Sequence, residues 1–213
     1  MFALCVFLKN NQNNLSGNWK GTLMPLLRYD ETVNVNGREK NIHSTRLLPV
    51  AVYDYDVVER PVPWHWHEEL ELFHLLSGSI VCMIGTSQFR LTSGEAYFVN
   101  TEVLHGAWSD TSASCRFHSI VFHPRLIGGD TTSVFWQKYL HPLQLNQSLP
   151  FMVFQPVEGW QRQVILQMEQ VVRAGIEGGQ DRRAQVEGRA VPRHQHSPPE
   201  PGLTVVGLSL IHI

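Results

Sequence analysis

The chain has 213 residues, 43% of them hydrophobic, which fits one soluble globular domain with an appendage. Lys and Arg total 17 against 19 Asp and Glu, and this formal charge of -2 excludes the basic surplus of a chain that binds nucleic acid by itself. No apolar run approaches the roughly 20 residues that span a bilayer, and three cysteines without metal-ligand spacing indicate free thiols in a reducing, cytoplasmic compartment.

Residues 1–24 are expected to form a poorly ordered extension. Residues 1–8 are apolar, but no basic residue precedes them and no small-residue cleavage site follows, so they do not have the pattern of a signal peptide. Residues 9–23 are polar and rich in Asn. Met24 begins a better-patterned stretch, which makes it an alternative native start.

Short strands are predicted for the middle of the chain, where apolar residues alternate with polar ones or form short runs. The predicted strands cover residues 47–58, 70–76, 79–84, 88–92, 96–100 and 116–123. Turn residues separate them at spacings of about eight to ten residues, which leaves no room for crossover helices. The pattern predicts an antiparallel, mainly β sandwich or barrel. Residues 124–159 lack a sustained period and are expected to wrap it as loops and short helical turns.

A helix is predicted next, beginning near Pro156 and ending at Gly178-Gly179. Its apolar stripe consists of Trp160, Val164, Ile165, Met168, Val171, Val172 and Ile176. Such a stripe must cover something, either its own barrel or the same helix of a second subunit. Residues 179–213 contain no aromatic residue and are predicted to be a disordered tail. Their composition resembles coding sequence read in a shifted frame, so we expect this tail to be non-native.

The polar residues that attract attention lie just before and after the strand at 70–76. On an extended strand, side chains at even separations point to one face, so His65, His67, Glu69 and Glu71 are expected to point the same way. A later strand that ends in a turn before His105 would bring a further imidazole back to them. Imidazoles and a carboxylate at this spacing suit a divalent metal or a polar ligand inside a barrel.

These residues resemble the two motifs of the cupin family. The first motif matches in His65, His67, Glu71 and Gly78, and the second in Gly94 and His105. The departures are Glu59 for Gly, Asn100 for Pro, Glu102 for Gly and Ser109 for Asn. The resemblance implies a cupin-type jelly-roll β-barrel followed by one or two helices. The departures concern metal binding, so no metal or other cofactor is expected; a bound metal would have the ligands His65, His67, Glu71 and His105.

A narrower resemblance is to the N-terminal sensor domains of AraC-type transcription regulators, carried by residues 64–71, 76–78, 93–96, 100–105 and 119–124. It covers residues 25–178 and implies a cupin sensor barrel over 25–155, a dimerisation-type helix over 156–178, and two helix-turn-helix units beyond. Those units need about 100 residues, whereas 34 remain after Gly179, without a helical stripe. We therefore expect a sensor domain without its DNA-binding half, unable to bind specific DNA sequences by itself.

The resemblance implies a small-molecule effector inside the barrel, and a sugar is one candidate. The aromatic side chains expected to stack on it are Trp64, Trp66, Phe73 and Trp108, beside the four polar residues of the motifs. An outward orientation of Trp64 and Trp66 is the alternative. The expected partner is a second copy of the chain through helix 160–177, with no membrane partner. Two other functions stay open: a metal-dependent cupin oxygenase or isomerase, and a sugar-binding module without a regulatory role.

Overall fold

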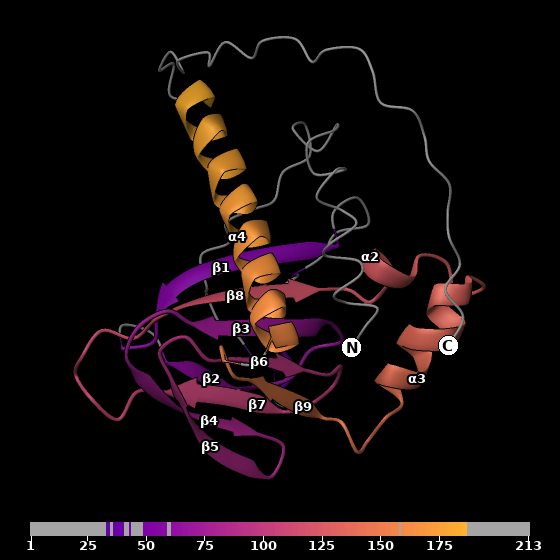
Figure 1. The fold of residues 1–213 in the computed structure, drawn as a ribbon, viewed down its shortest axis with the longest axis horizontal. Coiled ribbons are helices and arrows are strands. Elements are labelled where there is room, and N and C mark those ends of the chain that lie inside the picture. The colour runs from indigo at the N-terminus through magenta and orange to yellow at the C-terminus, as the bar shows by residue number, and fades with distance from the viewer. Residues whose placement is uncertain are drawn as a thin grey trace.

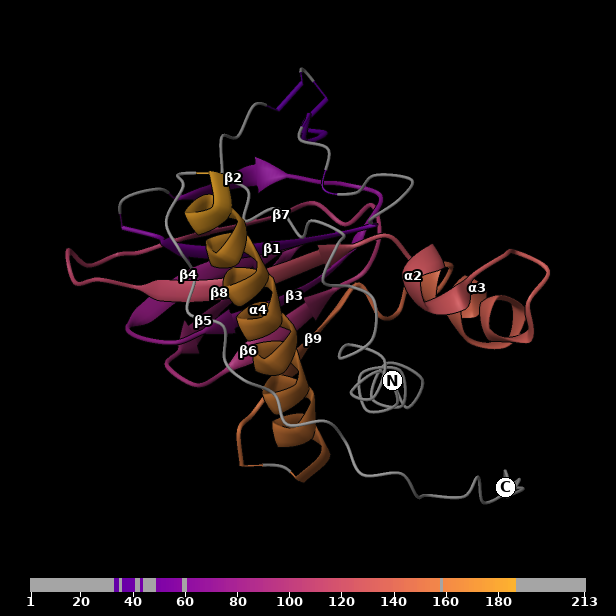
Figure 2. The same ribbon diagram turned by 90° about the horizontal axis from the view of Figure 1, so that it is seen from above.

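The computed structural model describes residues 33–34, 36–40, 43, 49–58, 61–157 and 159–186, with side chains described up to residue 176. In this part of the chain, two β-sheets face each other and a long helix lies across the outer face of one of them (Figure 1 and Figure 2). The expectations for residues 1–24 and for the tail beyond 186 lie outside the described residues.

The larger sheet has the strand order β1-β8-β3-β6-β9 and the smaller sheet the order β2-β7-β4-β5. All paired strands run antiparallel. The strands are β1 (Val50–Asp56), β2 (Val62–His65), β3 (Leu70–Leu75), β4 (Ser79–Ile84), β5 (Ser87–Thr92), β6 (Ala96–Val99), β7 (His105–Trp108), β8 (Arg116–Phe122) and β9 (Phe151–Phe154). The prediction of a mainly β, two-layered jelly-roll fold is confirmed.

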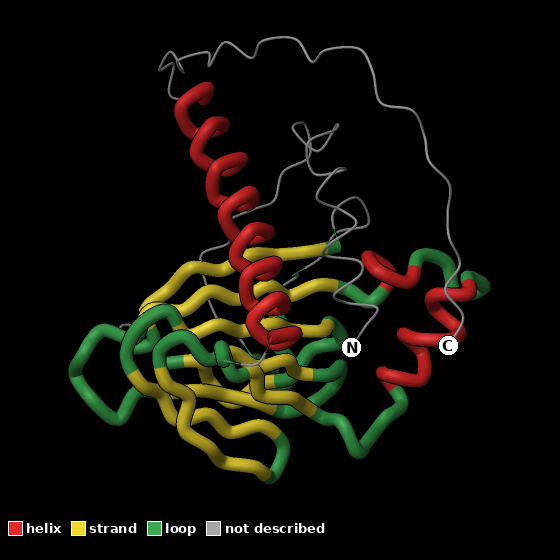
Figure 3. The backbone as a smooth tube through the Cα atoms, viewed as in Figure 1, coloured by secondary structure: helices red, strands yellow, loops and turns green. Residues whose placement is uncertain are grey.

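Strands β2, β7 and β9 do not follow from the sequence pattern. Each has four residues, which is too short for a period of two to stand out from its surroundings. The expectation that residues 124–159 contain only loops and helical turns is therefore wrong for β9, which pairs with β6. The helical turns are present as α2 (Arg125–Gly128), η2 (Trp136–Leu140) and α3 (His141–Gln144), which lie together beside the sheets (Figure 3).

Alternation along the strands divides the buried residues into two cores. In β3, Phe73 and Leu75 belong to the core between the sheets, whereas Leu70 and Leu72 belong to the core on the outer face of the larger sheet. Glu71 has the parity of Phe73, and successive side chains point to opposite faces of a sheet. Its carboxylate therefore enters the space between the sheets, directly beside an apolar core.

Helix α4 (Gly159–Val186) covers the outer face of the larger sheet (Figure 1). Val164, Ile165, Met168 and Val172 are buried in the outer core, so the described part of the apolar stripe packs on its own barrel. Trp160 departs from the expected stripe, with 46% of its surface exposed. No helix within the described residues is long and apolar enough to cross a membrane.

The predicted end of this helix at Gly178-Gly179 is wrong, because α4 continues to Val186. A glycine inside a helix costs roughly 1 kcal/mol relative to alanine, which weakens the helix but does not terminate it. The residues that follow the glycine pair include Gln180, Arg182 and Ala184, which are strong helix formers. The helix therefore continues past the predicted boundary at residue 178.

Gly78 occupies a turn that only glycine fits. Its φ is 86°, and a Cβ atom there would lie 2.5 Å from the sulfur of Cys115. Cys115 and Cys82 are both buried free thiols. Burial raises the pKa of the Cys82 thiol to about 12, and this residue packs as a small apolar side chain.

Candidate functional site

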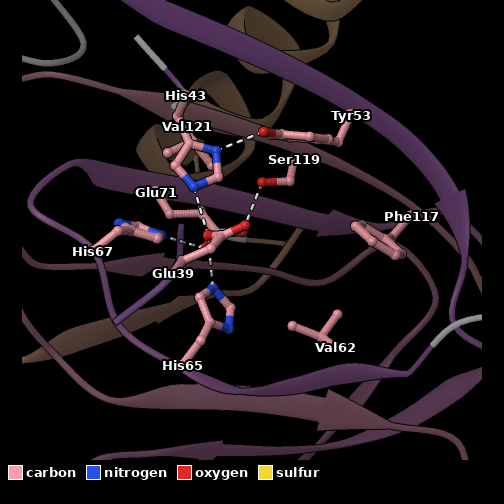
Figure 4. A pocket seen from close by; sticks show the side chains of 10 residues that line it. All are labelled: Glu39, His43, Tyr53, Val62, His65, His67, Glu71, Phe117, Ser119 and Val121. Atoms are coloured by element: carbon pink, nitrogen blue, oxygen red, sulfur yellow. Dashed lines mark hydrogen bonds and ion pairs between the residues drawn. The ribbon is translucent and has the colours of Figure 1, made fainter. Parts of the chain in front are cut away.

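A cavity lies between the two sheets (Figure 4). The ten side chains that line it are Glu39, His43, Tyr53, Val62, His65, His67, Glu71, Phe117, Ser119 and Val121. The space left between them is about that of one water molecule. In this conformation the cavity accepts an ion or a water molecule, and a larger ligand requires side chains to move.

Two imidazoles enter the cavity from the smaller sheet. His65 ends β2 and His105 begins β7, and the two are direct cross-strand partners. Their ring centroids are 4.2 Å apart, and both side chains are almost fully buried. Pairing of these two short strands is therefore what brings the second cupin-like motif next to the first.

His67 and Glu71 reach the cavity from other parts of the chain. His67 lies in the connection between β2 and β3, and Glu71 is the second residue of β3, in the larger sheet. The expectation that His65, His67 and Glu71 share one extended strand is therefore wrong, because the chain crosses from one sheet to the other between them. Their side chains still converge, because the crossing occurs at the edge of the space between the sheets.

Backbone carbonyl groups determine which nitrogen of each imidazole faces the cavity. His65, His67 and His105 each donate Nδ1–H to a carbonyl oxygen two residues away, at 2.9, 3.1 and 2.7 Å. In a neutral imidazole with this bond, Nε2 carries a lone pair and no hydrogen. Burial, followed by the charge of His105, lowers the pKa of His65 to about 3, so His65 is neutral near pH 7. His65 and His67 thus present nitrogen lone pairs suited to bind a cation, whereas Nε2 of His105 carries the hydrogen that the Glu71 carboxylate accepts.

We call the part of the cavity formed by His65, His67, Glu71 and His105 its inner half, and the part formed by Glu39 and His43 its outer half. The Glu71 carboxylate is the central hydrogen-bond acceptor of the inner half. Its Oε2 lies 2.9 Å from Nε2 of His105, and its Oε1 accepts a hydrogen bond of 2.6 Å from the Ser119 hydroxyl. Burial alone raises the pKa of Glu71, but His105 and the neighbouring His67 outweigh it and hold the pKa well below its usual range. Glu71 is therefore a buried carboxylate that stays ionised.

Glu39 and His43 form the outer half, which the sequence did not indicate. His43 lies 2.5 Å through Nε2 from the Glu39 carboxylate and 2.5 Å through Nδ1 from the Tyr53 hydroxyl. The Glu39 amide donates to the carbonyl of Trp66 at 2.9 Å, which anchors this segment beside the cavity. Burial raises the pKa of Glu39, but the hydrogen bond and charge of His43 outweigh it and lower the pKa.

The predicted aromatic residues lie away from the cavity lining. Trp64 and Trp108 have 39% and 36% of their surface exposed, and Trp66 covers the turn at residues 36–38, to which its indole donates a hydrogen bond of 3.0 Å. Phe73 is buried deeper in the barrel, stacked between two aromatic rings at centroid distances of 4.6 and 4.4 Å. The structure brings together the four predicted polar residues and separates them from the four predicted aromatic ones.

The buried polar residues fit a divalent cation. The ligand atoms of His65, His67, Glu71 and His105 all lie within 4.8 Å of one another. Nε2 of His67 is buried without a hydrogen-bond partner, 3.5 Å from the nearest Glu71 oxygen. Imidazole nitrogens with Nδ1 bonded to a carbonyl and a carboxylate are ligands of zinc, iron and manganese. When bound, such an ion supplies a Lewis acid that polarises the oxygen of a ligand.

A family model described as the AraC-like ligand binding domain matches residues 49–174. This span contains the four cupin-like polar residues, and Glu39 and His43 precede it. A curated relative, the uncharacterized HTH-type transcriptional regulator YdeC of Bacillus subtilis (strain 168), is 22% identical over 136 residues. The alignment covers 62% of this chain and 46% of the relative, so the chain spans about half the length of the curated relative it matches.

Solved structures with detectable similarity have low sequence identity to this chain. The cupin domain of Schizosaccharomyces pombe Cnp3 is 14% identical, with a TM-score of 0.30 over 36% of this chain and 55% of that one. A variant of Bacillus subtilis oxalate decarboxylase is 16% identical, with a TM-score of 0.31 over 35% of this chain and 21% of that one.

Proposed function

Because this chain belongs to the family of AraC-like ligand-binding domains, we propose that it is the effector-sensing part of a transcription regulator and that its effector binds in the cavity between the sheets. The observation that carries the proposal is the convergence of His65, His67, Glu71 and His105 between the sheets, beside an apolar core. Burying ionisable groups costs free energy unless they are paired. A barrel selected for stability alone would fill these positions with apolar side chains, as it does around Phe73.

The proposed effector is small and polar or ionic. Its recognition rests on nitrogen and oxygen atoms, because the cavity lining contains no tryptophan. A sugar, the candidate derived from the aromatic composition, is larger than the present space. It would enter only if the segment that carries Glu39 and His43 moved away from β1 and β2.

The regulatory action of the whole protein is proposed by analogy with the HTH-type relative. In this proposal, helix-turn-helix units follow α4 in a longer protein and bind DNA, while the present chain senses the effector and pairs with a second copy through α4. The C-terminal turns of α4 extend beyond the sheet (Figure 1).

Thermal unfolding in the presence of ligands tests the sensor proposal. A panel of sugars, small carboxylates and divalent metal ions is added to the wild-type chain and to His105→Gln, which lacks one cavity nitrogen. A ligand at about 100 times its Kd stabilises the folded state by about 2.7 kcal/mol. We expect stabilisation of the wild type that is weakened in His105→Gln and kept in Asp110→Asn, a change at an exposed ion pair. Equal stabilisation of all three proteins would place the ligand elsewhere and contradict the proposal.

A metal-dependent cupin enzyme is the second candidate, and the unpaired Nε2 of His67 is the observation that favours it. A sensor and an enzyme differ in turnover rather than in metal content. Chromatography of each stabilising compound after incubation with the iron- or manganese-loaded chain and dioxygen separates them. Recovery of the unchanged compound supports the sensor, and conversion abolished by His105→Gln supports the enzyme.

A further inference from the structure

The outer half of the cavity contains a second set of metal-ligand atoms. Glu39, His43 and His67 each offer one atom, and these three atoms lie within 4.8 Å of one another. All three residues are buried, with at most 4% of each side chain exposed. Glu39 and His43 lie before residue 49, where the family match begins, so the set includes two ligands from outside that match.

The His67 imidazole points to a ligand that completes this set. Its Nε2 is directed into the cavity, toward the carboxylates of Glu39 and Glu71 (Figure 4), and it has no hydrogen-bond partner. Leaving a buried polar atom unpaired costs free energy. A cation beside Nε2 removes this cost. Among the described lining residues, none donates a hydrogen bond to Nε2 of His67.

The number of ligands is sufficient for two ions. Because one Nε2 atom binds one cation, His67 can belong to only one of the two sets. When His67 is grouped with Glu39 and His43, the other set consists of His65, Glu71 and His105. Each half then has two imidazoles and one carboxylate, the ligand set of many zinc and non-haem iron sites. The halves are adjacent, because a Glu39 oxygen lies 3.5 Å from Nε2 of His65. Paired metal ions about 3.5–4 Å apart are a common arrangement in proteins.

We propose that the cavity, once its lining side chains move slightly apart, binds two divalent transition-metal cations side by side, the outer one held by Glu39, His43 and His67. Before binding, His43 carries an Nδ1–H and a second proton lies between its Nε2 and the Glu39 carboxylate. The cation displaces only this second proton, which goes to solvent, and Nε2 and a Glu39 oxygen become ligands. The Tyr53 hydroxyl then accepts the Nδ1–H of His43 and keeps the ring oriented. The proposal deepens the proposed function by naming a class of ligand for the same cavity, and it rests on that function only for the regulatory meaning of binding.

Metal stoichiometry of the whole chain tests the proposal. The chelator-treated chain is dialysed against zinc and against cobalt(II), and bound metal is measured per chain by elemental analysis. We expect two equivalents for the wild type, one for Glu39→Gln and for His43→Gln, and two for the surface control Asp110→Asn. Manganese(II) supplies a readout that needs no variant, because two adjacent ions couple magnetically and their electron paramagnetic resonance spectrum differs from that of a single ion.

One equivalent in the wild type with an uncoupled manganese spectrum would overturn the proposal, as would two equivalents in folded Glu39→Gln. Circular dichroism establishes whether each variant is folded, and the wild-type manganese spectrum decides the matter if a variant is not. The sensor proposal fails by a different result. A chain that binds two metal ions but does not respond to them or to any compound in a regulatory assay supports the cation pair without the sensor, and binding of an organic effector with a single metal ion supports the converse.

Discussion

Glu102 has a φ of 61°, in the left-handed region that favours glycine. It occupies a position where the cupin motif usually has Gly, and its amide donates to the His67 carbonyl at 2.8 Å. A side chain in this conformation costs about 1–2 kcal/mol. We expect Glu102→Gly to increase the free energy of unfolding by up to about 1 kcal/mol, after the larger entropy of unfolded glycine is subtracted. Urea unfolding measures this change. Glu102→Ala retains the Cβ atom and should give no comparable gain; an equal gain would mean that backbone strain is not the cause.

Phe73 and Trp64 were both expected to contact the ligand, but the structure places them in very different environments. Phe73 has 1% of its surface exposed and Trp64 has 39%. Phe73→Ala therefore creates a cavity in the core and should cost about 3–5 kcal/mol. Trp64→Ala should cost less than about 1 kcal/mol, as is usual at exposed positions. Denaturant titration of both variants checks this order, and a larger loss from Trp64→Ala would contradict the placement of that residue.

The inner half of the site could be predicted from the sequence, and the outer half could not. The spacings that recur in cupins are those of His65, His67, Glu71 and His105. These side chains converge as predicted, although the assumption that the first three share one strand was wrong. Tyr53 and Ser119 lie on predicted strands with inward parity and were within reach of the same reasoning. Glu39 and His43 belong to no periodic segment. Their burial depends on long-range contacts, which local pattern does not reveal.

Helix α4 is attached to the larger sheet by a buried ionic cluster as well as by its apolar stripe. The Glu169 carboxylate lies 2.7 Å from Nδ1 of His74 and 2.9 Å from Nδ1 of His118, which are cross-strand partners on β3 and β8. From β1, Asp54 lies 3.7 Å from His118 and is itself paired with Arg116. Burial raises the pKa of Glu169, but hydrogen bonds to His118 and His74 outweigh it and lower the pKa to about 2.

This cluster predicts an acid-dependent loss of stability. The folded-state pKa of Glu169 lies below its ordinary value of 4.5, so its contribution is complete above pH 4.5 and is lost as pH falls toward 2. Glu169→Gln should reduce the free energy of unfolding by about 1.5–3 kcal/mol at pH 6, the range for hydrogen bonds to charged groups. Urea unfolding between pH 6 and pH 3 should show this difference shrinking as pH falls. Parallel stability curves would mean that Glu169 makes no such contribution.

At the scale of whole elements, prediction from sequence worked where a segment was long and strongly periodic. Strand β4 was predicted with its observed bounds, and β3, β5, β6 and β8 within one residue at each end. Strands β2, β7 and β9 were missed because their formation depends on partners distant in the sequence. The end of α4 was misplaced because a glycine pair was treated as a terminator, although residues on both sides of it favour a helix.

For the whole molecule, the packing of α4 restricts how a second copy could bind. The apolar stripe of α4 was predicted to cover either its own barrel or a second subunit. It already packs on the barrel, since Val164 and Met168 are each 1% exposed. A dimer must therefore use the outward face, where Leu166 is 43% exposed. Analytical ultracentrifugation should show a dimer for the wild type and a monomer for Leu166→Glu, because a carboxylate at an apolar contact must be desolvated without a partner. Leu145→Glu makes the same substitution at a position that is 66% exposed and lies off α4, and it should remain a dimer. A monomeric wild type would contradict self-association of this chain, and dissociation caused by Leu145→Glu alone would place the contact away from α4.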